Sequence, residues 1–184
     1  YTFVNDTLVS KIAKCLYKIA FRFPKEIWFL NEDDRSEFVK RGLVPENKTM
    51  VLHGEGVDTE YFSPQPNPND DGKIRFLLVA RMLWDKGVGE YVEAARHIKA
   101  KYPNTTFQLL GACGVANPSN IGQEQINEWV NEGVVEYLGT TQDVRPIIAQ
   151  AACVVLPSYR EGIPRTMIEA AAMAKPIIVS SAPG

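Results

Sequence analysis

The stretch PSYREGIPRTMIEAAAMAKPIIVSSAPG, residues 157–184, decides the fold because it joins two apolar strands through a loop and a helix. The run CVVLPS at 153–158 is apolar, β-branched and of strand length. Pro164 suits the first turn of the following helix, since its φ is preset and it has no N–H to leave unpaired. We expect that helix over 165–174 and a second apolar strand, PIIVSS, after it.

From residue 74 onward the chain alternates between strand-like and helix-like segments. The expected strands are IRFLLVA, TFQLLGA, VVEYLG, CVVLPS and PIIVSS. One expected helix ends at Lys101 and presents an apolar face made of Val88, Tyr91, Val92, Ala95 and Ile98. Others are expected around Ile126, Trp129 and Val130, over 143–151, and over 165–174. Five strands alternating with four helices predict an α/β, Rossmann-like parallel sheet covered on both faces, which binds ligands at the carboxyl ends of its strands.

The segment SPQPNPNDDG at 63–72 is the clearest boundary, because three prolines among Asn and Asp form a stiff, polar linker. We therefore divide the chain into residues 1–62, a linker at 63–73 and the sheet domain at 74–184. The first part is expected to hold helices at 5–23 and 32–41 and strands at 26–30 and 49–53. The start at Tyr1, without a Met, indicates a piece of a longer protein.

Composition excludes several classes of function. The net charge of −2 gives no global attraction to nucleic acid. Two histidines make a zinc site improbable, and no apolar run approaches the ~20 residues of a membrane span. The odd number of cysteines, Cys15, Cys113 and Cys153, favours reduced thiols in a cytoplasmic protein, with a place at the inner face of a membrane left open.

Two carboxylates near the start of the last helix indicate a ligand that carries both phosphate and sugar. A helix N-terminus offers unpaired N–H groups to an anion, and Gly162 lets the backbone approach a ligand closely. Glu161 and Glu169 are poor partners for phosphate but good acceptors for ribose or sugar hydroxyls. Thr166 either donates to a phosphate oxygen or caps its own helix.

The pattern from Glu161-Gly162-Ile163-Pro164 to Glu169-Ala170 resembles the E-x7-E signature of retaining glycosyltransferases of family 4, which have the GT-B fold. RMLWDKG at 81–87 looks like that family's second signature, and GEGVD at 54–58 resembles its G-x-G-V-D. The resemblance covers nearly the whole chain. It implies that 1–62 ends an acceptor-side domain and that 74–184 is the nucleotide-sugar domain.

The resemblance assigns roles to individual residues. Arg81 and Lys86 would stabilise the leaving diphosphate, although both also fit the description of surface charges beside a helix start. Glu161 would position the donor sugar and Glu169 the ribose. The remaining donor contacts would come from Gly162, Ile163, Pro164, Thr166 and the backbone around Leu138.

The implied activity is transfer of a sugar from a nucleotide donor, UDP-linked rather than GDP-linked, with retention of configuration. The acceptor would be a glycan or a lipid-linked glycan in surface polysaccharide biosynthesis, with no metal or other cofactor required. A GT-B sugar-nucleotide epimerase and a non-catalytic nucleotide-binding module are the alternatives. The chain lacks the histidine of the family's first domain, so we expect weak donor binding without turnover.

Two further segments leave alternatives open. Residues 5–25 place Leu8, Ile12, Cys15, Ile19 and Phe23 at helical spacing, with Lys11, Lys14, Lys18, Arg22 and Lys25 between them. This is either a basic amphipathic surface for an anionic membrane or an ordinary solvated face. Acidic residues 32–34 are interpreted as helix capping rather than a metal site. The chain departs from the family pattern at Ala174, where glycine is common, and at Ser181.

Overall fold

The computed structural model describes residues 8–67 and 71–182, which form two compact units that divide between Glu55 and Gly56. The division falls before the predicted linker because residues just ahead of that linker pack onto the second unit. Phe62 lies against its hydrophobic core, and the Arg145 guanidinium stacks 3.6 Å from the centre of the Tyr61 ring. Assignment of 1–62 to a separate domain stays a prediction.

The second unit is built on a five-stranded parallel sheet of order β5-β4-β3-β6-β7, as the alternating pattern predicts. Its strands are β3 (Ile74–Val79), β4 (Thr105–Leu110), β5 (Glu136–Tyr137), β6 (Cys153–Leu156) and β7 (Ile177–Val179). Its helices are α3 (Val88–Lys101), α4 (Gln123–Asn131), α5 (Arg145–Gln150) and α6 (Arg165–Ala172). The strand order reverses direction between β3 and β6, the position where such sheets bind ligands.

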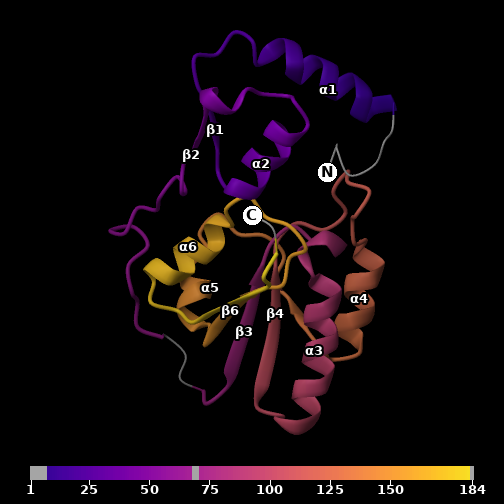
Figure 1. The fold of residues 1–184 in the computed structure, drawn as a ribbon. Helices are drawn as coiled ribbons and strands as arrows, with labels where there is room; N and C mark the ends of the chain where they lie inside the picture. The colour runs from indigo at the N-terminus through magenta and orange to yellow at the C-terminus, as the bar shows by residue number, and fades with distance from the viewer. Residues whose placement is uncertain (1–7, 68–70, 183–184) are drawn as a thin grey trace. The chain divides into compact units, whose positions relative to one another are not determined.

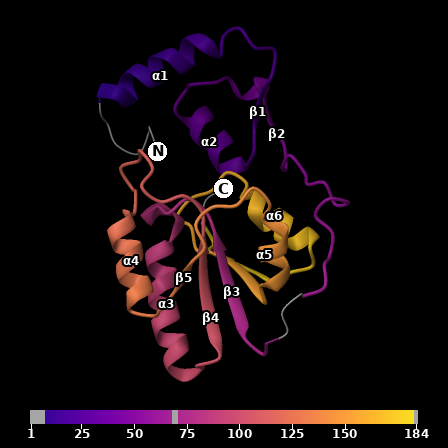
Figure 2. The ribbon, with the colours of Figure 1, turned by 180° about the vertical axis from the view of Figure 1, so that it is seen from behind.

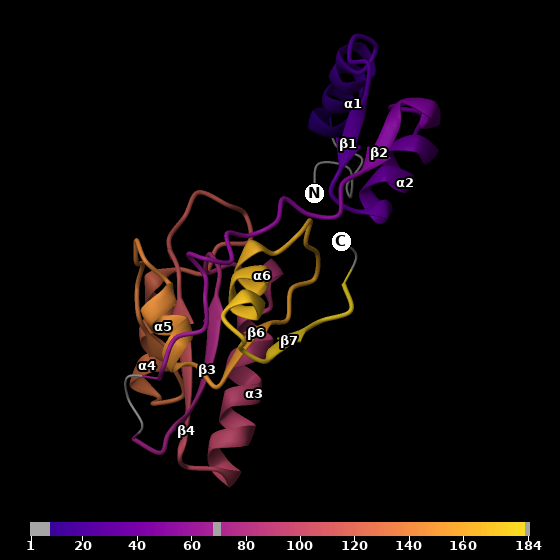
Figure 3. The ribbon, with the colours of Figure 1, turned by 90° about the vertical axis from the view of Figure 1, so that its left-hand side faces the viewer.

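Helices cover both faces of this sheet (Figures 1 and 2), except at the edge strand β7, where Ile177, Ile178 and Val179 are 42%, 54% and 51% exposed. One core joins α3 and α4 to residues such as Leu78 and Leu109, and the other joins α5 and α6 to Leu77 and Val154. Neighbouring strand residues point to opposite faces, so Leu77 and Leu78 serve different cores. Figure 3 shows α6 beside β6, with β7 following it back to the sheet edge.

One sequence expectation about this unit is wrong in detail. β5 has two residues instead of six, because it is an edge strand paired only with β4, and Val134 and Val135 are buried in the core before it begins. The helix expected around Ile126, Trp129 and Val130 is present as α4, in which Ile126 and Trp129 are buried and Val130 is 39% exposed. The error at β5 concerns a strand whose pairing partner comes from a distant part of the chain.

The first unit contains α1 (Leu8–Ala20), β1 (Ile27–Phe29), α2 (Glu32–Lys40), a 3-10 turn η1 (Glu46–Lys48) and β2 (Thr49–Val51). β1 and β2 pair in parallel. Ile27, Phe29 and Val44 form a small core, against which Phe21 and Phe38 pack. Within the described residues, no helix is both long and apolar enough to cross a membrane.

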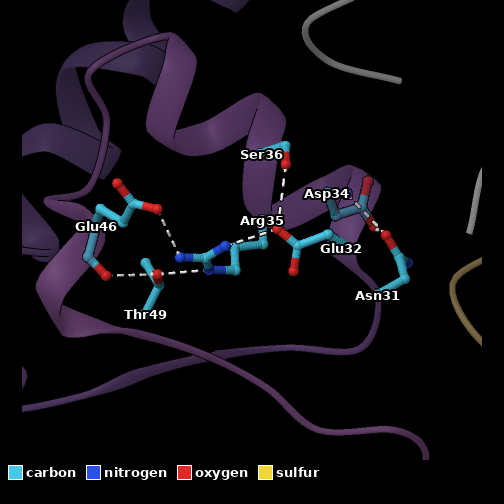
Figure 4. A network of polar contacts seen from close by, with 7 residues as sticks. All are labelled: Asn31, Glu32, Asp34, Arg35, Ser36, Glu46 and Thr49. Atoms are coloured by element: carbon cyan, nitrogen blue, oxygen red, sulfur yellow. Dashed lines mark hydrogen bonds and ion pairs between the residues drawn. The ribbon is translucent and has the colours of Figure 1, made fainter.

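Arg35 ties α2 to the segment before β2 (Figure 4). Its guanidinium donates to Glu32 at 2.6 Å, Glu46 at 3.0 Å and the Thr49 hydroxyl at 2.8 Å. Asn31 caps α2 by accepting from the Asp34 amide at 2.7 Å. The acidic residues 32–34 lie in the first turn of α2, where they offset the helix dipole, and Glu32 also binds Arg35.

The end of α6 contains a strained residue. Ala174 has φ +56°, the only positive φ outside glycine among the described residues. Its amide donates to Ala171 O, and the next amide donates to Ala170 O, which is the Schellman pattern that normally places glycine here. The left-handed conformation brings Cβ too close to the following carbonyl, so alanine is unfavourable. The left-handed φ explains why glycine is common at this position, and nothing in the structure explains its replacement by alanine.

We expect Ala174→Gly to stabilise the chain by about 1 kcal/mol in urea unfolding, because it removes the left-handed penalty at that position. The matched control is Ala171→Gly, one turn earlier in α6. It should destabilise the chain by a similar amount, about 1 kcal/mol, because it adds a glycine inside a helix. Equal effects of the two changes would contradict this account.

Candidate functional site

The predicted site residues gather at the carboxyl ends of the paired strands β3 and β6. β3 leads to Arg81 and to η2 (Trp84–Lys86), a 3-10 turn that precedes α3. β6 leads through a loop containing Glu161 to α6, which carries Glu169. Because the two strands are adjacent and parallel, residues about 80 positions apart in sequence meet at one edge of the sheet.

Lys86 and Glu161 form an ion pair across this edge, with 2.6 Å between Nζ and Oε1. Their side chains are 22% and 18% exposed, so the pair is largely shielded from water. The Ser158 hydroxyl donates to the same Glu161 oxygen at 2.5 Å. Ser158 is buried, and it holds the carboxylate toward Lys86. Two residues predicted for different parts of a donor are therefore direct partners here.

The backbone fixes the distance between the two loops. The Tyr159 amide donates to the Asp85 carbonyl at 3.0 Å, and the Tyr159 hydroxyl donates to Glu90 on α3. Gly87 has φ +70°, and a Cβ at this position would lie 2.1 Å from the Pro157 carbonyl oxygen. Only glycine allows such an approach, so η2 and the loop after β6 are held tightly together.

Arg81 differs from Lys86 in having no partner. Its side chain is exposed and, within the described residues, forms no hydrogen bond or ion pair. The two residues that follow it, Met82 and Leu83, are buried, and Met82 exchanges backbone hydrogen bonds with Ala112 and Ile121. Arg81 thus projects a charge from a firmly anchored turn. A bidentate contact with a phosphate there would not require the backbone to become more ordered.

Glu169 is a half-buried carboxylate that accepts no hydrogen bond within the described part of the chain. Burial raises the pKa of Glu169 above its ordinary value, and attraction to Arg165 opposes that shift. A carboxylate that is desolvated but not hydrogen-bonded is destabilising unless a ligand supplies donors. Among the predicted site residues it is the one whose environment calls for hydroxyl groups.

The start of α6 offers backbone donors. Pro164 occupies the N-cap position and has no side-chain hydrogen bond to the helix, while the Met167 amide turns back to the Pro164 carbonyl. Thr166 does not cap the helix, since its hydroxyl has no partner in the described residues. Gly162 and Ile163 lie half-buried in the loop before it.

Leu138 lies further along the sheet edge, directly after β5. Its amide donates to the Leu109 carbonyl at 2.8 Å, and the Gly139 carbonyl accepts from Gly111 at 2.7 Å. The backbone of this segment is therefore ordered by β4. Any contact with a base is restricted to its other backbone groups.

Sequence reasoning missed Ser158, Glu90 and Tyr159. Ser158 was placed in the expected strand, and only its position at the strand end hinted at a polar role. The Tyr159–Glu90 contact joins residues 69 positions apart and leaves no local signal. The described residues contain no group of three or more His, Cys, Asp or Glu side chains placed to hold a metal ion. Cys15, Cys113 and Cys153 are free thiols, of which only Cys153 is buried.

Comparison of the fold with solved structures identifies its class. The chain aligns with Alr3699/HepE from Anabaena, solved in complex with UDP and glucose, at a TM-score of 0.76 and 18% identity. The alignment covers 95% of this chain and 50% of that protein. The sheet order and this alignment show the fold of the C-terminal half of a GT-B protein, with a short preceding α/β segment.

Sequence comparison gives the family. Residues 73–184 match the model of the glycosyl transferases group 1. The chain is 35% identical over 188 residues to N,N'-diacetylbacillosaminyl-diphospho-undecaprenol alpha-1,3-N-acetylgalactosaminyltransferase of Campylobacter jejuni, covering 96% of this chain and 48% of that protein. It is 25% identical to UDP-Gal:alpha-D-GlcNAc-diphosphoundecaprenol alpha-1,3-galactosyltransferase of Escherichia coli, covering 99% of this chain and 50% of that one. The chain belongs to the glycosyl transferases group 1 family, and it spans about half the length of these relatives.

Glu169 generates a pH prediction. The pKa of Glu169 is raised in the folded state, so folding favours its protonated form. Its contribution to the free energy of unfolding is therefore complete below the ordinary pKa of 4.5 and is lost as pH rises through the folded-state pKa. Glu169→Gln imitates the protonated form and should be more stable than the parent chain at pH 7, as a higher urea midpoint would show.

The gain should disappear in urea titrations at pH values below the ordinary pKa of the carboxyl. Glu60→Gln, at an exposed position of the same unit, is the control and should change stability little at either pH. A destabilised Glu169→Gln at pH 7 would contradict the proposed desolvation.

Proposed function

We propose that this chain is the donor-binding part of a retaining glycosyltransferase that moves a sugar from UDP to a glycan or lipid-linked acceptor in surface polysaccharide biosynthesis. The observation that carries the proposal is the convergence of Arg81, Lys86 and Glu161 at the carboxyl ends of β3 and β6. Family membership supports the reaction class. The two named relatives, whose names specify diphospho-undecaprenol substrates, support the acceptor class.

Arg81 and Lys86 stabilise the diphosphate that leaves with the nucleotide. Negative charge builds on this group as the glycosidic bond breaks, and fixed cations beside it lower the barrier. Arg81 is unpaired and available for a bidentate contact, whereas Lys86 must share its ammonium between the phosphate and Glu161. These two residues supply the positive charge that a metal ion provides in other transferases, so we propose that no metal is needed.

Glu161 and Glu169 bind hydroxyl groups. Ser158 and Lys86 occupy one Glu161 oxygen, and we assign the other to the donor sugar. Glu169 accepts from the ribose, whose hydroxyls replace the hydrogen bonds that burial has removed from the carboxylate. Ligand binding is thereby strengthened by relief of a cost already present in the free protein.

Backbone and hydroxyl groups complete the donor site. The backbone of Gly162, Ile163 and Pro164 packs against sugar and phosphate, and Thr166 donates to a phosphate oxygen at the start of α6. The segment around Leu138 contacts the base. UDP is favoured over GDP because Alr3699/HepE was solved with UDP and because the named Escherichia coli relative carries UDP-Gal in its name.

Titration calorimetry with UDP, GDP and ADP tests the donor assignment. We expect saturable binding of UDP that weakens about tenfold in Glu169→Ala, the loss of a contact of about 1.4 kcal/mol. Arg81→Ala should weaken binding by about tenfold or more, because a charge-assisted phosphate contact is lost. Glu60→Ala, in an exposed part of the same unit, should bind UDP like the parent.

Other outcomes separate the rival functions. Conversion of a UDP-sugar without acceptor would indicate an epimerase, and tight UDP binding unaffected by Glu169→Ala would indicate a phosphate-binding module. We expect the purified chain to bind donor without transferring sugar. Detectable transfer would contradict that expectation while supporting the reaction class.

A further inference from the structure

The first unit contains a cavity of about 500 Å³ whose charge is entirely positive. Its lining consists of Lys18, Phe21, Arg22, Gly42, Leu43, Val44, Pro45 and Lys48. Three of these side chains are cationic and none is a carboxylate. The volume lies within the range of small-molecule sites, ~300–1,000 Å³. A concave site with uncompensated positive charge attracts an anion.

One of the three cations, Lys48, is held in place by the fold. The Lys48 ammonium donates to the carbonyls of Arg22 and Pro24, each at 3.1 Å, which fixes it beside the end of α1. Two of its contacts are to neutral groups, so its charge is not cancelled. The side chains of Lys18 and Arg22 form no hydrogen bond or ion pair within the described residues. They remain available to a ligand.

The same segment exposes a broad apolar arc beside these cations. The members of this α1 arc recur every three or four residues and are Leu8, Ile12, Leu16 and Ile19 on α1 and Phe23 just after it, exposed by 74%, 53%, 61%, 49% and 82%. Another side of the segment packs on the unit through Tyr17 on α1 and Phe21 just after it, whose rings lie 5.4 and 6.0 Å from that of Phe38. The arc is therefore not the face that holds the helix in place.

We propose that α1 binds the surface of an anionic phospholipid bilayer, with the α1 arc in the acyl boundary and a lipid phosphate in the cationic cavity. An amphipathic helix with large apolar residues on one side and Lys and Arg beside them lies in the membrane interface. Charge complementarity selects this occupant, because a purely apolar protein partner would leave Lys18 and Arg22 unpaired. The attraction is local, since the whole chain carries a net charge of −2.

The proposal concerns the first unit and is independent of donor binding, which is assigned to residues of the second. Of the two interpretations of residues 5–25, the proposal adopts the membrane surface, for the described part of that segment. The side chains of Lys18 and Arg22 make no hydrogen bond or ion pair within the described residues, whereas the Lys48 ammonium contacts two backbone carbonyls and Phe21 and Val44 contribute to the small core. Neutralising Lys18 and Arg22 should accordingly leave folding intact.

Co-sedimentation of the 184-residue chain with phosphatidylcholine vesicles, with and without phosphatidylglycerol, tests the proposal. We expect binding only when phosphatidylglycerol is present. Lys18→Gln combined with Arg22→Gln should reduce binding by about tenfold for each cation, because each loses a charge-assisted contact with phosphate. Equal binding to both kinds of vesicle, or to neither, would overturn the proposal.

Two matched controls separate the cavity from general electrostatics. Lys11→Gln combined with Lys25→Gln removes the same charge from residues near α1 that do not line the cavity, and should cost only severalfold at physiological salt. Lys73→Gln combined with Lys101→Gln, in the second unit, should have no effect. Equal losses from the first two pairs would refute the phosphate cavity.

Leu16→Ser combined with Ile19→Ser tests the α1 arc. Both side chains are exposed, so the fold should survive, as circular dichroism would verify, while vesicle binding should be lost. Full vesicle binding by this variant would refute insertion of the arc. UDP titration of every variant keeps the two proposals apart, because donor binding should be unchanged whatever the vesicles show.

Discussion

The candidate donor site depends on the close approach of two backbone segments at Gly87. A side chain at this position would meet the Pro157 carbonyl at 2.1 Å, so the carboxyl ends of β3 and β6 can be this near only with glycine. The approach brings Lys86 within 2.6 Å of Glu161 and lets Tyr159 bond to Asp85. The absence of a side chain at Gly87 thus determines where the charged groups of the site lie, and the packed sheet behind them holds them in position.

α6 and the residues that end it carry two unfavourable features. Glu169 is partly desolvated without hydrogen-bond donors from the described residues, and Ala174 is in a left-handed conformation two residues beyond the helix. The two costs have different origins. The carboxylate can be relieved by a ligand with hydroxyl groups, whereas no ligand can change the φ of Ala174. Unfavourable features that a ligand relieves are typical of binding sites, and this distinction supports the role that we propose for Glu169, whereas Ala174 has no such role.

The sheet could be predicted because its information is local. Apolar runs such as IRFLLV and CVVL are buried on both faces in a parallel sheet. Each of these strands can therefore be recognised from its own sequence, without knowledge of the strands beside it. The length of β5 was overestimated because edge pairing depends on distant residues. The roles of Glu161 and Glu169 came from a family pattern, but the Lys86–Glu161 pair joins residues 75 positions apart and had no signal in either segment. The cationic cavity likewise unites α1 with the turn after α2, which no periodicity reveals.

Cations are used in two different states in this chain, and the difference has consequences for selectivity. Lys86 is already paired, so a phosphate must replace part of an existing ion pair, and only a ligand that also satisfies Glu161 recovers the loss. Such a site discriminates between a nucleotide sugar and a simple anion. Lys18 and Arg22 are unpaired and near exposed apolar surface, so any lipid phosphate gains the full attraction. On our assignments the paired cation confers selectivity for the donor, whereas the unpaired cations concentrate the protein at a charged surface without selecting among its lipids.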